Sequence, residues 1–322
     1  MNLHEPLKTF VAACMVLFAA SSTAQTWPLK PIRLVVSFAP GGPTDVVARL
    51  LGEKFQAAWG QPVVVDNRIG AGGTIGSAFI AKSAPDGYTL NLAASSHVYN
   101  GALFNNLPYD PIRDFTPIAR VSYYPLLLIT HPSLPVNNVG ELVAYAKSNP
   151  GKLAFGSAGG GTGSHLTAEL FQRTAGINVL IVHYKSAGAA TNDLLGGRLQ
   201  VMFDNPVSAL PHVDSKKVRA IATTGLKPAV NLSLPTVAGS GYANFESGVW
   251  FALIGPAGLP GNIASKISNE TAAVLEMQEI RKALAGLGLE PAYSNAEQLG
   301  ASMRFDLEKY SKLIRDADIK MN

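Results

Sequence analysis

The sequence predicts an α/β protein of two lobes that form a clamshell, each lobe an open, mostly parallel sheet flanked by helices. Three observations predict this fold. Short β-rich runs alternate with helical patterns, which is typical of parallel α/β sheets. The alternation stops and then resumes, with a long apolar strand on either side of the resumed part. Of 322 residues, 47% are hydrophobic and 15% charged, which is enough apolar material for two cores.

The first lobe is predicted from a regular strand-helix-strand rhythm. Its helices show apolar residues returning every three or four positions, and its strands are short β-rich runs. Segment 110–117 is rich in turn residues and ends this part. The predicted strands are 32–38, 62–65 and 88–92, and the predicted helices are 46–55 and 71–80.

The second lobe lies between two apolar crossings, predicted at 124–130 and 249–254. We therefore expect residues 25–124 to form the first part of lobe 1 and residues 125–248 to form lobe 2. Residues 249–322 return to lobe 1 and carry a mainly helical tail. Inside lobe 2 we expect helices at 141–147, 164–174 and 189–195 and strands at 153–156, 179–183, 201–203 and 218–223.

The N-terminus has the pattern of a cleavable export signal. Lys8 supplies positive charge, residues 10–20 are apolar, and small residues lead to Ala24. We expect residues 1–24 to be a signal peptide cut near Ala24, which predicts a periplasmic location. Cys14 lies in a lipoprotein-like sequence, but the apolar core continues well beyond it, so we favour the signal-peptide interpretation.

Composition excludes several classes of function. Cys14 is the only cysteine and falls in the expected signal, so thiol nucleophiles, cysteine metal sites and redox motifs are excluded. The net charge of +4 is scattered without a basic run, which argues against nucleic acid. The histidines lack metal-ligand spacing, so no metal or cofactor is expected.

A glycine-rich turn follows the first strand and opens the next helix. Glycines let the backbone approach a ligand closely, and the helix N-terminus favours an anion. Thr44 adds a hydroxyl. Asp45 caps the helix, holds a water or a ligand ammonium, or only stabilises the first turn. The binding residues predicted here are Phe38, Ala39, Pro40, Gly41, Gly42, Thr44 and Asp45.

A second glycine-rich turn joins a strand to a helix in the other lobe. Its four glycines and three hydroxyl side chains predict a nest of N–H and O–H donors for an anion. One such turn in each lobe favours a site between the lobes, with the Thr44 and Ser164 side chains contacting the ligand. The predicted residues are Ser157, Gly161, Thr162, Ser164 and His165.

Other strand ends face the same cleft, because ligands of open α/β sheets bind beyond the carboxyl ends of the strands. Lys185 is either an anion partner or a solvated loop lysine. His97 and His165 contact the ligand or serve as hydrogen-bonding structural residues. The residues predicted from these ends are Ser95, Ser96, His97, Lys185, Ala187, Asp204 and Asn205.

No catalytic arrangement stands out. No Gly-x-Ser-x-Gly elbow surrounds Ser157 or Ser164, and no phosphate loop is present. The glycines of 70–76 resemble a dinucleotide fingerprint, but the third glycine is one place late. The sequence therefore predicts a binding protein without catalytic residues rather than an enzyme.

Motifs throughout the mature chain carry a family resemblance. They are Trp27–Pro28, 31–36, 38–45, 65–73, 84–90, 107–111, 114–115, 164–165, 184–185, 193–197 and 201–205. With them the chain resembles the substrate-binding proteins of tripartite tricarboxylate transporters, the Bug family of periplasmic receptors. Ile69, in place of an expected proline, and Ala187 depart from the family pattern.

The resemblance implies a type II periplasmic binding protein fold and a carboxylate held between the lobes by main-chain groups and bridging waters. It implies a dicarboxylate, tricarboxylate, acidic amino acid or aromatic acid as ligand, handed by a monomeric receptor to membrane transporter subunits. Two alternatives are a periplasmic partner that reports the ligand to a signalling system and an exported enzyme acting on a carboxylic acid. Ligand binding is expected to close the lobes.

Overall fold

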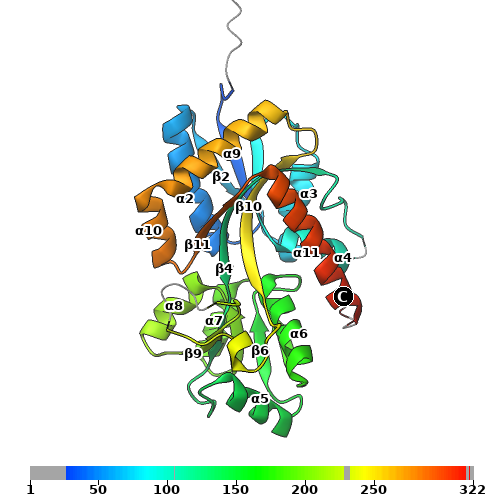
Figure 1. Ribbon diagram of the computed structural model, residues 1–322, viewed down its shortest axis with the longest axis vertical. Coiled ribbons are helices and arrows are strands. Elements are labelled where there is room, and N and C mark those ends of the chain that lie inside the picture. Colours follow the sequence, from blue (N-terminus) through cyan, green and yellow to red (C-terminus); the bar gives the residue numbers. More distant parts are fainter. Residues whose placement is uncertain (1–26, 105, 228–232, 317–318, 320–322) are drawn as a thin grey trace, which may run out of the picture.

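The computed structural model describes residues 27–104, 106–227, 233–316 and 319. The predicted signal peptide, with Cys14 and the expected cleavage near Ala24, lies outside these residues. Two lobes are stacked one above the other, and two long strands run between them (Figure 1). Each lobe is a sheet covered by helices, so the predicted two-lobed α/β fold is confirmed.

The first lobe contains a six-stranded sheet of order β11-β4-β10-β3-β1-β2. Strand β1 pairs in parallel with β2 and β3, whereas β10 is antiparallel to both β3 and β4. The strands are β1 (Ile32–Val36), β2 (Val63–Asn67), β3 (Thr89–Ala94), β4 (Phe115–Pro125), β10 (Gly248–Pro256) and β11 (Glu290–Ser294).

Helix α2 (Pro43–Trp59) shows how the sequence builds the helices of this lobe. Pro43 sits in the first turn, where its missing N–H costs nothing. Val47, Leu51 and Phe55 form the buried stripe, and Gly60 ends the helix in the left-handed conformation at φ 67°. The remaining helical segments are η1 (Ala71–Gly73), α3 (Thr74–Ala81), α4 (Ser96–Leu103), α9 (Gly261–Glu276), α10 (Gln278–Gly286) and α11 (Ala296–Asp316).

The second lobe contains a five-stranded sheet of order β7-β6-β8-β5-β9. Phe155, Phe171 and Phe203 pack against one another in its core with no exposed surface. The elements are β5 (Leu127–Thr130), α5 (Val139–Ser148), β6 (Ala154–Ser157), α6 (Gly163–Ala175), β7 (Leu180–His183), α7 (Ala187–Leu195), β8 (Val201–Asp204), α8 (Pro206–Asp214), β9 (Arg219–Thr223) and η2 (Ala238–Ser240).

Both sheets are mixed, which corrects the expectation of mostly parallel sheets. The parallel strands come from the strand-helix-strand units, as predicted. The strands that enter or leave a lobe do not follow such units: β4 and β10 pair antiparallel in the first sheet, and β5 is antiparallel to β8 and β9 in the second. Helices α4 and α8 and strand β11 were also missed. Pro211 inside α8 and Pro291 in β11 hide their patterns.

The chain passes between the sheets at Leu126, which separates β4 from β5, and again at Ser247, just before β10. Thr224 joins the two passages. Its hydroxyl accepts a hydrogen bond from the Leu126 N–H at 2.7 Å and donates one to the Ser247 carbonyl at 2.6 Å. All three residues are buried. Main-chain bonds join the same residues: the Thr224 N–H donates to the Leu126 carbonyl and the Ser247 N–H donates to the Thr224 carbonyl, each at 3.0 Å. Thr224 therefore links the two passages through its side chain and its main chain.

We expect Thr224→Val to lower the free energy of unfolding by about 1–3 kcal/mol, because it leaves a buried N–H and a buried carbonyl without this partner. Chemical denaturation measures the change. Thr174→Val is the control, since Thr174 is exposed and bonds only to the Leu170 carbonyl within α6. Equal stability of the two variants would show that the Thr224 side chain does not stabilise this link.

Candidate functional site

A cavity of about 800 Å³ lies between the two lobes. It is lined from the first lobe by the N-terminal ends of α2 and α4 and by η1, which precedes α3. From the second lobe it is lined by the N-terminal ends of α6, α7 and α8. Helix N-termini present unpaired N–H groups and a partial positive charge. Helix N-termini of both lobes therefore point into one cavity, and this arrangement favours binding of an anion.

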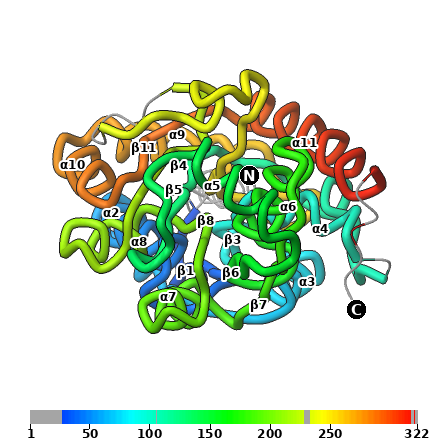
Figure 2. The backbone as a smooth tube through the Cα atoms, turned by 90° about the horizontal axis from the view of Figure 1, so that it is seen from below, coloured from blue at the N-terminus to red at the C-terminus, as the bar shows by residue number. Residues whose placement is uncertain are grey.

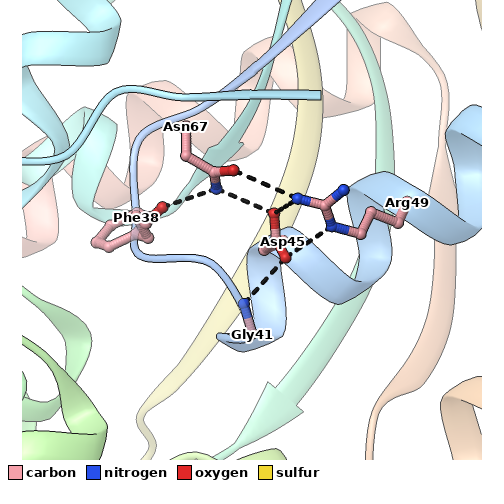
Figure 3. A network of polar contacts seen from close by, with 5 residues as sticks. All are labelled: Phe38, Gly41, Asp45, Arg49 and Asn67. Carbon is pink, nitrogen blue, oxygen red and sulfur yellow. Dashed lines mark hydrogen bonds and ion pairs between the residues drawn. The ribbon is translucent and has the colours of Figure 1, made fainter. Parts of the chain in front are cut away.

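The first glycine-rich turn is held in place by Asp45 (Figure 3). Its Oδ2 accepts hydrogen bonds from the Gly41 N–H at 3.0 Å and from Arg49 Nε at 2.9 Å. Its Oδ1 accepts from Arg49 Nη2 and from Asn67 Nδ2, each at 3.0 Å. Asn67 Nδ2 also donates to the Phe38 carbonyl at 3.0 Å. The two ends of the turn are therefore tied to one carboxylate.

The same contacts decide the charge of Asp45. Burial alone would raise the pKa of this carboxyl, but the hydrogen bonds from Arg49, Gly41 and Asn67 and the Arg49 charge outweigh it and lower the pKa. Asp45 is thus ionised and fully engaged inside the turn. It is not among the residues that line the cavity. Of the alternatives left open by the sequence, the structure favours stabilisation of the turn.

Thr44 is the side chain of this turn that offers a hydroxyl to the cavity. It lines the cavity and is 3% exposed. Within the described part of the chain its hydroxyl makes no hydrogen bond to protein. The predicted neighbours Phe38, Ala39, Pro40, Gly41 and Gly42 also line the cavity. Their contact with a ligand stays a prediction.

The hydroxyl groups of Thr162 and Ser164 donate their hydrogen bonds within the second glycine-rich turn. Thr162 Oγ1 donates to the Gly159 carbonyl at 2.7 Å and lies 3.0 Å from Ser164 Oγ. Because a hydroxyl has one proton, Ser164 must be the donor to Thr162. Ser164 Oγ also accepts from the Ala158 N–H at 2.8 Å. Both side chains line the cavity, and their hydrogen bonds stabilise the conformation of the turn.

His165 and Ser157 support this turn from behind. His165 Nδ1 accepts from the Gly161 N–H at 3.1 Å, and its Nε2 lies 3.6 Å from a Glu169 carboxylate oxygen. Ser157 Oγ lies 2.8 Å from His183 Nδ1. His165, Ser157 and Gly161 are not among the lining residues. In this structure these residues position the turn and do not line the cavity, where the sequence predicted direct contact with the ligand.

His97 and Ser95 also lie away from the cavity wall. His97 Nδ1 lies 2.9 Å from Ser77 Oγ, its Nε2 lies 3.0 Å from the Pro111 carbonyl, and its ring stacks on Tyr109. Burial lowers the pKa of His97 to about 4, although the bond to the Pro111 carbonyl opposes this. His97 is therefore a neutral core histidine, the structural alternative considered from the sequence. Ser95 is the N-cap residue that precedes α4, and it is buried.

The remaining predicted residues line the cavity. They are Ser96, Lys185, Ala187, Asp204 and Asn205. Lys185 is exposed and forms no ion pair with a described residue. Asn205 caps α8, because its side chain accepts from the Ser208 N–H at 2.9 Å. Asp204 and Lys185 are the charged lining residues among those that the structure describes.

Sequence reasoning missed a second group of lining residues, many of them apolar. The glycines of 70–73 had a detectable signal, a glycine-rich stretch after a strand. The aromatic and aliphatic side chains had none, because apolar periodicity cannot distinguish a cavity wall from a core. The missed residues are Ser37, Ile69, Gly70, Ala71, Gly72, Gly73, Tyr99, Phe104, Tyr124, Leu126, Val207, Ser208, Val249 and Phe251.

The two lobes touch beside the cavity, with glycines at the contact. A Cβ added to Gly72 would lie 2.7 Å from the Gly160 carbonyl oxygen of the other lobe. A Cβ on Gly161 would lie 2.5 Å from Asn100 Oδ1 of α4. Viewed from below, α6 and α4 lie next to each other (Figure 2), and Leu166 of α6 packs into one apolar cluster with α4 and α11. The lobes are therefore closed on each other.

The described residues contain neither a candidate metal site nor a candidate membrane span. No group of three or more His, Cys, Asp or Glu side chains there could hold a metal ion. None of the helices there has the length and apolar character needed to cross a bilayer.

Two mixed α/β lobes that close over a cavity lined by helix N-termini define a solute-binding protein of the periplasmic receptor class. The family comparison agrees: the tripartite tricarboxylate transporter family receptor matches residues 47–319. The chain belongs to this family. The family is one of substrate-binding receptors, so the expectation of a receptor rather than an enzyme is confirmed, as is the resemblance to the Bug proteins.

Solved structures of similar proteins support the assignment. An R. palustris protein with adipate is 32% identical with a TM-score of 0.88, over 92% of this chain and 99% of its own. The periplasmic binding protein BugD is 35% identical with a TM-score of 0.85, over 92% and 100%. MatC from Rhodopseudomonas palustris, with bound malate, is 30% identical with a TM-score of 0.82, over 89% and 100%.

Proposed function

We propose that this protein is an extracytoplasmic receptor that binds a small organic carboxylate between its lobes and delivers it to the membrane subunits of a tripartite tricarboxylate-type transporter. One observation carries the proposal: helix N-termini of both lobes converge on the cavity between the lobes, beside the free hydroxyl of Thr44. The adipate and malate bound by two similar proteins support the ligand class. Export of a monomer by a signal peptide cleaved near Ala24 belongs to the same proposal.

The ligand is held mainly by main-chain groups. The N–H groups in the first turn of α2, α6, α7 and α8 have no partner inside their helices. Side-chain caps occupy those of His165, Ala189 and Ser208, and the other first-turn N–H groups remain for a carboxylate or a bridging water. The apolar wall, including Tyr99, Tyr124 and Phe251, covers the carbon body of the acid. Because both lobes contribute donors, a bound acid favours the closed arrangement by its greater affinity for it.

A thermal-shift screen tests this function. Adipate, malate, citrate, glutamate and benzoate are added in turn, and we expect at least one to raise the unfolding midpoint in a saturable way. Mass spectrometry of the stabilising acid after prolonged incubation should show it unchanged. Conversion of the acid would indicate an enzyme, and failure of every acid to stabilise the protein would contradict the proposed ligand class.

A further inference from the structure

One carboxyl group lies in the wall of the cavity without a cation beside it. Asp204 ends β8, lines the cavity and is 1% exposed. Within the described ranges it forms no salt bridge. A second negative charge next to a bound carboxylate disfavours the ionised form of both groups. A receptor for anions with such a residue needs a way to remove that charge.

The hydrogen bonds of Asp204 can serve a neutral carboxyl as well as an ionised one. Its Oδ1 accepts from the Asn205 N–H at 2.8 Å and from Asn205 Nδ2 at 2.9 Å. Its Oδ2 lies 3.1 Å from Thr191 Oγ1, which lies 2.9 Å from the Ala187 carbonyl. A hydroxyl has one proton, so Thr191 cannot donate to both oxygens. When Asp204 is ionised, Thr191 can donate to its Oδ2. When Asp204 carries a proton on Oδ2, it can donate to Thr191 Oγ1, and Thr191 then donates to the Ala187 carbonyl.

The elements packed around β8 supply no compensating charge. Strands β5 and β6 contain no titratable side chain. On α6, His165 Nε2 lies 3.6 Å from a Glu169 carboxylate oxygen, and Arg173 is exposed in the last turn. On α7, Asp193 accepts from Arg198. Helix α8 carries His212 and Asp214 only in its last turn. The environment of the carboxyl is therefore set by burial and by neutral hydrogen-bond partners.

Two further groups face the same space. Tyr124 of β4 lines the cavity and is neutral, because burial raises its pKa above the ordinary value. Lys185 lines the cavity from the turn before α7 and is exposed. For Asp204 itself, burial raises the pKa to about 6, although hydrogen bonds from Asn205, Ser208 and Thr191 oppose the rise. The carboxyl thus titrates just below neutral pH in the empty protein.

We propose that Asp204 takes up a proton from solvent when the carboxylate ligand binds, so that the receptor selects a carboxylate together with one proton. The inference rests on the proposed function and adds a specificity residue to it. The negative ligand raises the proton affinity of the buried carboxyl, and by linkage the protonated receptor binds the ligand more tightly. The neutral carboxyl then stands beside the anion without repelling it.

The test is titration calorimetry with adipate, malate or benzoate, whichever stabilises the protein, between about pH 6 and pH 8, where carboxylic acids of ordinary pKa are ionised. In buffers of different ionisation enthalpy we expect uptake of close to one proton per acid at about pH 7. Affinity should fall with rising pH, by at most about tenfold per pH unit. Asp204→Asn should lose both the proton uptake and this pH dependence, and Asp214→Asn, which changes an exposed carboxyl outside the cavity, should keep both.

Other outcomes overturn the inference in distinguishable ways. Binding without proton uptake in the wild type would remove it and leave the proposed function standing. Loss of binding by Asp204→Asn, with no proton uptake by the wild type, would overturn the inference, because Asp204 would then act as an ionised hydrogen-bond acceptor for a ligand hydroxyl or a bridging water. If no acid binds, the proposed function fails and the inference falls with it.

A measurement without ligand checks the premise. The folded-state pKa of Asp204 is raised, so the folded protein binds more protons than the unfolded chain between about pH 4 and pH 6. The contribution of Asp204 to the free energy of unfolding therefore falls as pH rises through that window. Asp204→Asn does not titrate there. We expect the unfolding midpoint of Asp204→Asn minus that of the wild type to increase as pH is raised from about 4 to 6 and to stay constant at higher pH. A difference that does not change with pH would contradict the premise.

Discussion

Replacing Gly161 with alanine is expected to weaken ligand binding by at least about 100-fold, or about 2.7 kcal/mol. Gly161 lies in lobe 2, and a Cβ there would lie 2.5 Å from Asn100 Oδ1 and 3.1 Å from Leu103 Cδ2 of lobe 1. The added methyl group therefore opposes closure, because the Asn100 and Leu103 side chains would have to move for the lobes to meet. A ligand held in an open cavity contacts the donors of one lobe only, and calorimetry with the stabilising acid measures the loss.

The control for this variant is Gly176→Ala. Gly161 and Gly176 have positive φ angles, 74° and 60°, so alanine is strained at both positions. Gly176 ends α6, and a Cβ added there would meet no atom within 4 Å, so only Gly161 adds a clash between lobes. Small-angle scattering should show that the acid reduces the radius of gyration of Gly176→Ala but not of Gly161→Ala. Equal affinities for the two variants would contradict closure as the basis of tight binding.

Thr44→Val is expected to weaken binding by about 10- to 150-fold, equivalent to about 1.5–3 kcal/mol, the range for a hydrogen bond to a charged group. Valine keeps the shape of threonine but lacks the hydroxyl that Thr44 presents to the cavity. The empty protein should be at least as stable as the wild type, because the hydroxyl has no protein partner among the described residues. Calorimetry and thermal unfolding measure the two effects separately.

Thr271→Val provides the matched control. Thr271 is as buried as Thr44, lies in α9 of the same lobe and donates only to the Ile267 carbonyl. It does not line the cavity. We expect this variant to bind the acid with wild-type affinity. A Thr44→Val variant that also binds like the wild type would place the ligand away from the first turn.

The positions of the two glycine-rich turns could be predicted from sequence, because a strand, a glycine cluster and a helix follow one another in each. The roles inside the turns could not. Asp45 and Ser164 both follow a glycine cluster, yet Asp45 is held by Arg49 and Asn67, and Ser164 donates its proton to Thr162. These partners depend on three-dimensional contacts, including a strand far along the chain.

The direction of the strands within each sheet could also be predicted only in part from the sequence. The helical and strand periods predicted β1, β2 and β3 as a parallel set, which the structure confirms. Nothing in the pattern of β10 indicates that it inserts antiparallel between β3 and β4, because a fully buried strand is apolar in either direction. Its direction follows from the return of the chain from lobe 2, which is a property of the whole fold.

The central claim is that the cavity between the lobes binds a carboxylate. It is tested most directly by calorimetric titration of the wild-type protein with the stabilising acid and with the corresponding carboxamide, which has the same shape without the charge. We predict saturable binding of one acid per chain and no measurable binding of the amide up to its solubility limit. Equal binding of acid and amide would contradict the account, because the helix N-termini would then contribute no selectivity for an anion.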